Sequence, residues 1–201
     1  MPRITDARRA ERRAQILDAA RSCFQERGLH LTTMDDIIRA SGLSAGAVYG
    51  YFASKEALIL AAIAGGLEGI GALVAPILAR RPPPAPAELA GALTAAIDRA
   101  SAGGADIRRI AVLGWAEAQR DPGVRAAMAP AYAGFLAALT SVAAVWRDAG
   151  LLAPGTAPAD AARVVLALCL GHVAQVAVLG EAAPGALESG LAGLLRPAGP
   201  S

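Results

Sequence analysis

Aromatic residues, cysteine and histidine are scarce in this chain of 201 residues. Aromatic residues make up 4% of the sequence, although hydrophobic residues as a whole reach 55%, with alanine supplying much of that fraction. An alanine-rich composition favours closely packed helices, and no strand-like alternation of apolar and polar residues occurs along the chain. The length allows one large domain or two small ones with a sizeable core. We therefore expect an all-α fold of about nine helices.

The few cysteines and histidines exclude several kinds of site. Cys23 and Cys169 lie far apart and lack the spacing of metal ligands, so we expect two buried thiols in a reducing cytoplasm. His30 is expected to be exposed, and His172 either a hydrogen-bonded residue of a core or dimer interface, or part of a pocket lining. We expect no metal and no other cofactor. The charged first residues lack the apolar run of a secretory signal, which favours a cytoplasmic protein.

Positive charge is also sparse, because the net charge is only +2. The chain has no basic tail or strongly basic domain, but its N-terminus is locally basic. The residues concerned are Arg3, Arg8, Arg9, Arg12 and Arg13, set against Asp6 and Glu11. Beside a nucleic-acid reader such charges contact phosphates, whereas most charged stretches are solvated helix faces. Charge alone leaves both interpretations open.

Two apolar runs raise the alternative of a membrane protein. Residues 57–79 are apolar apart from Glu68, and residues 164–180 form a second run. Length alone allows the first to span a membrane. Much of its apolarity comes from alanine and glycine, which drive insertion weakly, and an acidic residue lies near its centre. We therefore interpret both runs as buried helices of a soluble bundle and expect no membrane partner.

Residues 31–58, LTTMDDIIRASGLSAGAVYGYFASKEAL, predict two short helices joined by a tight turn and followed by a third helix. Thr33 with Asp36 three residues later has the pattern of a capping box. Gly42 can adopt the left-handed conformation that ends the first helix, and Ser44 can cap the second. Helix, short glycine-containing turn and helix is the pattern of a helix-turn-helix DNA reader.

This stretch resembles the DNA-binding signature of the TetR family of bacterial transcriptional regulators, and the resemblance is dense from Arg8 to Leu60. It rests on Thr32-Thr33, Ile37-Ile38, Ala40, Gly42-Leu43-Ser44, Gly46, Val48-Tyr49, Tyr51-Phe52 and Lys55-Glu56-Ala57-Leu58. Beyond this region only the length and the run of helices match. The resemblance implies an N-terminal three-helix helix-turn-helix DNA-binding domain, residues 1–53, and a C-terminal helical domain for effector binding and dimerisation, residues 54–201.

The expected recognition helix, residues 44–51, would present its N-terminal side chains to bases in the major groove. It contains no Arg, Lys, Asn or Gln, although Ala45 can touch a thymine methyl group and Tyr49 can reach a base or phosphate. By resemblance, Thr33, Tyr51 and Lys55 occupy phosphate-contact positions. The predicted DNA-binding residues are therefore Thr33, Ser44, Ala45, Gly46, Tyr49, Tyr51 and Lys55.

Larger side chains concentrate in the central and later helices, where they are either core residues or the lining of an apolar effector pocket. The pocket hypothesis comprises Trp115, Met128, Tyr132, Phe135, Trp146, His172 and Gln175. A small, largely apolar effector would fit such a lining. The apolar helix at residues 159–180 needs cover on several sides, and with residues 186–195 it is expected to pair with a second copy in a homodimer.

Gly42-Leu43-Ser44-Ala45-Gly46 matches Gly-x-Ser-x-Gly, the nucleophile elbow of serine hydrolases. That motif requires a strand before the serine and a sheet behind it, and the sequence predicts neither. We interpret the match as chance and expect no enzyme activity.

Together these patterns predict a ligand-responsive transcriptional regulator, a repressor released from a roughly palindromic operator by a small-molecule effector. The lack of long polar side chains in residues 44–51 supports an alternative from another class. In that alternative the protein is a helical small-molecule-binding or interaction module whose DNA reader is weak or vestigial.

Overall fold

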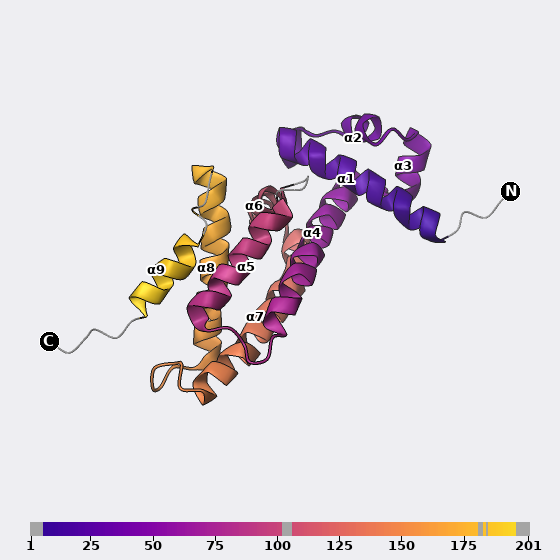
Figure 1. Cartoon of the computed structure of the whole chain (residues 1–201). Helices are drawn as coiled ribbons and strands as arrows, with labels where there is room; N and C mark the ends of the chain where they lie inside the picture. The colour runs from indigo at the N-terminus through magenta and orange to yellow at the C-terminus, as the bar shows by residue number, and fades with distance from the viewer. Residues whose placement is uncertain (1–5, 102–105, 181–182, 184, 196–201) are drawn as a thin grey trace. The chain divides into compact units, whose positions relative to one another are not determined.

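The computed structural model describes residues 6–101, 106–180, 183 and 185–195, and the regular secondary structure within them is entirely α-helical (Figure 1). The helices of this part of the chain are α1 (Asp6–Leu31), α2 (Met34–Ser41), α3 (Ala45–Tyr51), α4 (Lys55–Leu78), α5 (Pro86–Ser101), α6 (Ile107–Ala118), α7 (Pro122–Asp148), α8 (Pro158–Leu179) and α9 (Ala186–Leu194). The all-α fold and the expected number of helices are confirmed.

Backbone contacts divide the chain into two compact units. The first unit covers residues 1–67 and 103–128, and the second covers residues 68–102 and 129–201. The first thus contains α1, α2, α3, the start of α4, α6 and the start of α7. The division predicted after residue 53 separates DNA reading from effector binding, which is a functional distinction, and it stays a prediction.

The first unit is built on one apolar stripe of α1. Ile16, Leu17, Ala20, Cys23 and Phe24 recur at helical spacing, and all are buried. Helix α2 packs against α1, and Figure 1 shows both short helices, α2 and α3, beside α1. These two helices bury Ile37 and Val48. Helical spacing in α1 thus supplies much of the core of this unit.

A break at Gly28 interrupts α1 before its last residues. Gly28 has φ 79° and ψ 166°, a conformation open only to glycine. The Thr32 hydroxyl, which is buried, lies within hydrogen-bond distance of the carbonyl oxygens of Cys23, 3.1 Å, and Gly28, 2.8 Å. The Thr32 hydroxyl thus lies where it can donate to backbone carbonyls at and before the break.

The second unit has its core between α5, α8 and the parts of α4 and α7 that belong to it. The buried residues include Leu89, Leu93, Leu139, Trp146 and Val165. The indole N–H of Trp146 donates to the Pro84 carbonyl at 2.8 Å, so the largest buried side chain is also hydrogen-bonded.

Helix α9 lies against α5, which also packs on α8. The approach is close at Gly91, where an added Cβ would lie 2.8 Å from the Glu188 Cβ. Only glycine therefore fits at this position of α5 without moving α9.

Burial raises the pKa of the Cys169 thiol to about 12, as expected for a packed rather than a reactive cysteine.

Three helices, α4, α7 and α8, are long and apolar enough to cross a membrane by length and composition. Each also contributes buried residues, for example Leu58 from α4, Leu139 from α7 and Val165 from α8.

Candidate nucleic-acid interface

The two ends of α2 are both fixed by local structure. The Thr33 hydroxyl accepts from the Asp36 N–H at 3.2 Å, and the Asp36 carboxylate accepts from the Thr33 N–H at 3.0 Å. The Thr33 hydroxyl also donates to the Asp36 carboxylate at 2.7 Å, and this bond, with the one from the Thr33 N–H, lowers the pKa of the Asp36 carboxyl. Gly42 takes φ 67° at the C-terminal end of α2. The predicted capping box and left-handed glycine are both confirmed.

Helix α3 begins at the predicted serine cap. Ser44 has an extended backbone, and its hydroxyl accepts from the Ala47 N–H at 3.3 Å. Ser44, Ala45, Gly46 and Tyr49 are exposed along the helix, and the exposed fraction of Tyr49 is 49%. The structure therefore brings four of the predicted DNA-binding residues to one accessible face of α3. This face carries hydroxyl, methyl and backbone groups.

The predicted phosphate-contact residues flank this face in different environments. Thr33 is exposed at the start of α2, whereas Tyr51 and Lys55 are half-buried. The Lys55 ammonium donates to the carbonyl oxygens of His30, 3.1 Å, and Thr32, 3.0 Å. Lys55 thus ties the start of α4 to the segment that follows the Gly28 break. Sequence reasoning missed this structural role, because the partners lie 25 and 23 residues away.

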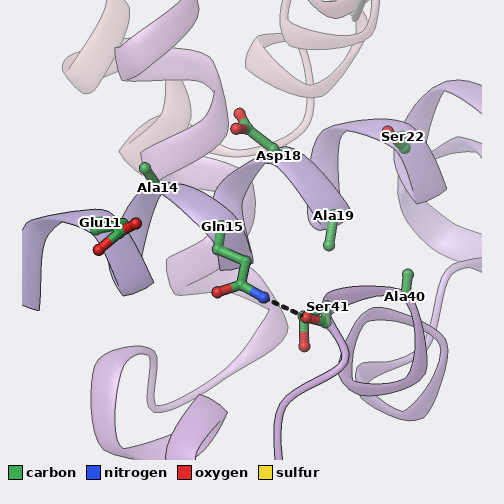
Figure 2. Close-up of a pocket in the computed structure, with 8 residues that line it drawn as sticks. All are labelled: Glu11, Ala14, Gln15, Asp18, Ala19, Ser22, Ala40 and Ser41. Atoms are coloured by element: carbon green, nitrogen blue, oxygen red, sulfur yellow. Dashed lines mark hydrogen bonds between the residues drawn. The ribbon is translucent and has the colours of Figure 1, made fainter. Parts of the chain in front are cut away.

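A shallow groove between α1 and the end of α2 shows a second tie (Figure 2). The Gln15 amide donates to the Ser41 carbonyl at 2.8 Å across this groove, as the dashed line in Figure 2 marks. Ser41 directly precedes the turn at Gly42. The bond therefore holds the end of α2, and with it the turn into α3, against α1.

Helix α6 supports α1 within the same unit. The Gln25 amide donates to the Asp106 carbonyl at 3.0 Å. The exposed His30 imidazole lies 3.3 Å from a Glu117 carboxylate oxygen and 3.3 Å from an Arg120 guanidinium nitrogen. The predicted exposure of His30 is confirmed, while its two charged neighbours on the α6 side could not be inferred from spacing.

The residues of the pocket hypothesis fall into both units. Trp115 and Met128 belong to the first unit, where Trp115 is half-buried and Met128 is buried. Tyr132, Phe135 and Trp146 belong to the second, where Phe135 packs against the core of which Trp146 is part. Trp146 therefore has a structural role in the core, and an effector role for this set stays a prediction.

His172 of α8 is buried and pairs with a residue that sequence reasoning missed. Its Nε2 lies 3.0 Å and 3.1 Å from the two carboxylate oxygens of Asp98 in α5. His172 therefore has the hydrogen-bonded environment that was one of the two expectations for it. The pair joins α8 to α5 inside the second unit. Gln175, one turn later, is exposed.

The Gly-x-Ser-x-Gly match lies in a helix–turn–helix rather than a strand–turn–helix. Helix α2 precedes Ser44, and the serine hydroxyl caps α3.

No group of three or more His, Cys, Asp or Glu residues in the described part of the chain could hold a metal ion.

The N-terminal part of the chain is similar in sequence to known bacterial regulators. A family model described as "Bacterial regulatory proteins, tetR family" matches residues 16–62, which span α2, α3 and the adjoining parts of α1 and α4. The HTH-type transcriptional repressor Rv1474c of Mycobacterium tuberculosis is 43% identical over 61 residues, or 30% of this chain and 33% of that protein. The chain covers about a third of the length of the first curated relatives that it matches.

The likeness in fold extends over nearly the whole chain. The structure of Salmonella enterica GusR aligns with 96% of this chain and 99% of its own, with a TM-score of 0.73 and 29% identity. The transcriptional regulator FadR from Bacillus subtilis, solved in complex with stearoyl-CoA, aligns with 90% of this chain and 96% of its own. Its TM-score is 0.71 and its identity 18%, so this likeness is one of fold alone.

Proposed function

We propose that this chain, whose residues 16–62 match the model of bacterial regulatory proteins of the tetR family, is a ligand-responsive transcriptional repressor of that family. The observation that carries the proposal is the reader itself. Its caps, turn and supporting stripe hold α3 with one accessible face, as a helix that enters the major groove requires. The matched relative from Mycobacterium tuberculosis is described as a repressor.

DNA contact in this proposal combines a few base contacts with many phosphate contacts. Ala45 and Tyr49 are the residues of α3 best suited to touch base edges, and Ser44 and Gly46 allow close approach of the helix. Thr33, Tyr51 and Lys55 are proposed to face the phosphates. Because direct base contacts are few, sequence-dependent DNA shape supplies part of the specificity.

A homodimer is the proposed binding form, because the last two helices leave large apolar side chains uncovered within one chain. Val164, Val178 and Leu179 of α8 are 57%, 82% and 70% exposed, and Leu194 and Leu195 at the end of α9 are 84% and 57% exposed. Pairing with a second copy would remove these side chains from water. Two readers related by a two-fold axis would then recognise half-sites about one DNA turn, or a multiple of it, apart.

A small, largely apolar effector is proposed to bind the helices after the reader and to favour a form that fits the operator poorly. FadR, which shares the fold, was solved with stearoyl-CoA, a ligand with a long apolar chain. The coupling must be reciprocal, so operator DNA weakens effector binding by the same factor. We further propose that the protein works in the cytoplasm, with no membrane and no enzyme activity.

Helix α4 is the proposed lever between the effector and the reader. It starts at Lys55, beside the reader, and passes through Gly65-Gly66. An added Cβ at Gly65 would lie 2.5 Å from an Arg21 guanidinium nitrogen of α1, so the absence of a side chain lets Arg21 rest on α4. If Gly65→Ala variants stayed folded and released DNA normally on effector addition, α4 would not be the lever.

Selection from a random pool of duplex DNA tests the proposed function directly. The expected winner is a palindrome, bound with an affinity that falls steeply with salt. A panel of acyl-coenzyme A and other apolar small molecules is then screened for release of that DNA. Each compound that releases DNA should bind the free protein more tightly than the protein–DNA complex.

One observation favours a second candidate function. The accessible face of α3 carries no Arg, Lys, Asn or Gln, so the reader offers no bidentate base contact. A helical small-molecule-binding or interaction module with a vestigial reader would have this property. Selection without enrichment, together with only weak and salt-labile DNA binding, would support that module over the repressor.

A further inference from the structure

Arg13 of α1 lies over the ring of Phe52, the residue at which α3 ends. The guanidinium carbon is 5.2 Å from the ring centroid. Phe52 is buried, and its backbone N–H donates to the Val48 carbonyl at 3.0 Å, which closes the last turn of α3. A cation over an aromatic face at this distance is attracted by the ring electrons. The contact therefore fixes a positive charge beside the C-terminal end of α3.

This stacked arrangement leaves the donors of Arg13 available for a ligand. The N–H groups of a guanidinium lie in its plane, so an aromatic ring occupies its face and not its donors. Arg13 is exposed, and among the described residues no carboxylate forms an ion pair with it. In contrast, Arg21 of the same helix is paired with Asp18 at 3.1 Å, and Arg27 with Asp36 at 3.0 Å.

The neighbouring face of α3 makes such a donor valuable. Its exposed side chains end in the hydroxyls of Ser44 and Tyr49 or in methyl and hydrogen groups. A reader of this kind depends on backbone phosphates for most of its affinity, and arginine binds phosphate through two parallel N–H donors. An arginine held in one orientation loses less side-chain entropy on binding than a mobile one.

We infer that Arg13 is a DNA-phosphate-binding residue whose guanidinium is oriented for that contact by the ring of Phe52. The inference rests on the proposed function, because it concerns the same reader. It adds α1 to the DNA-contacting surface and assigns Phe52 a role beyond core packing.

Salt-dependent binding tests this role on the operator duplex obtained by selection. Dissociation constants are measured from 50 to 200 mM salt for the full-length protein and for Arg13→Ala, Arg13→Gln and Arg13→Lys. The matched control is Arg80→Ala, which removes another exposed arginine, this one from the second unit. Circular dichroism checks that each variant is folded.

Loss of one phosphate contact lowers the slope of log affinity against log salt by about 0.9. In the proposed dimer the substitution removes one contact from each protomer, so the slope should fall by about 1.8 in total. The affinity difference between wild type and Arg13→Ala should therefore shrink by about 12-fold between 50 and 200 mM salt, and Arg13→Gln should behave alike. Arg13→Lys should keep the slope while binding more weakly, because an ammonium carries the charge but neither stacks nor donates in a plane. The control should match the wild type.

A second comparison tests the role of the ring. In a Phe52→Leu background, the slope change caused by Arg13→Ala should fall to less than half of its value in the wild-type background, since the guanidinium is no longer oriented. An equal change in both backgrounds would overturn the role of Phe52.

The outcomes separate this inference from the proposed function. An unchanged slope in Arg13→Ala, while the wild type binds the operator, would overturn the phosphate contact and leave the repressor intact. Absence of operator binding by the wild type itself would overturn both.

Discussion

Replacing Lys55, the only lysine of the chain, by alanine should destabilise the free protein before any DNA is added. The Lys55 ammonium donates to the carbonyl oxygens of His30 and Thr32 at 3.1 Å and 3.0 Å. These carbonyls follow the break at Gly28 and precede α2. The substitution therefore removes the tie between the start of α4 and the segment that leads into the reader.

The expected loss follows from the two bonds. A hydrogen bond to a charged group contributes about 1.5–3 kcal/mol when buried, but here one bond is exposed and water replaces part of it. We expect a loss of about 1–2 kcal/mol in the free energy of unfolding. For a chain of this size that corresponds to a fall in Tm of about 2 to 8 °C.

Thermal unfolding followed by circular dichroism, without DNA and at one fixed protein concentration, measures this loss. Arg80→Ala serves as the control for removal of a positive charge and should leave Tm within about a degree, as most surface substitutions do. A Tm of Lys55→Ala equal to that of the wild type would refute the structural role. The salt slope of DNA binding then reports separately whether Lys55 also contacts a phosphate, because lost stability alone leaves that slope unchanged.

Three further substitutions test other contacts. Because bonds from Thr33 lower the pKa of the Asp36 carboxyl, the stability that Asp36 contributes is present above its unfolded-state pKa and is lost as the pH falls through the lower folded-state value. The urea midpoint of unfolding should therefore drop more steeply below about pH 4 for the wild type than for Asp36→Asn. Trp146→Phe leaves the Pro84 carbonyl without its donor and should lower the free energy of unfolding by about 1–3 kcal/mol in urea titrations, whereas a value near zero would mean that water replaces the indole. Gly91→Ala should displace α9 and reduce amide-exchange protection over residues 186–194, and unchanged protection would contradict the close packing on α5.

Features that depend on neighbouring residues were predictable from the sequence. Thr33 hydrogen-bonds to Asp36 three residues later, and Ser44 caps α3 by accepting from the Ala47 N–H. Gly42 ends α2 through its own left-handed conformation. The buried stripe of α1 follows from helical spacing in the same way. Local chemistry thus decides where helices begin, end and turn their apolar sides.

Features that depend on distant residues were not predictable. His172 contacts Asp98, which is 74 residues away in the sequence, and the Trp146 indole donates to the Pro84 carbonyl, 62 residues away. Nothing in the spacing of either residue indicates its partner, because the fold brings the helices together. For the same reason the sequence suggested a phosphate role for Lys55 but gave no sign of its carbonyl partners.

The two glycines of α3 have a consequence for how such a reader can change its target. An added Cβ at Gly46 or Gly50 meets no atom within 4 Å, and neither backbone needs a positive φ. Longer side chains can therefore be introduced on this face without repacking the core, and each replacement of glycine also favours the helix. The same scaffold can accept new base-contacting side chains one substitution at a time. A change in the preferred DNA sequence therefore need not pass through a variant that fails to fold.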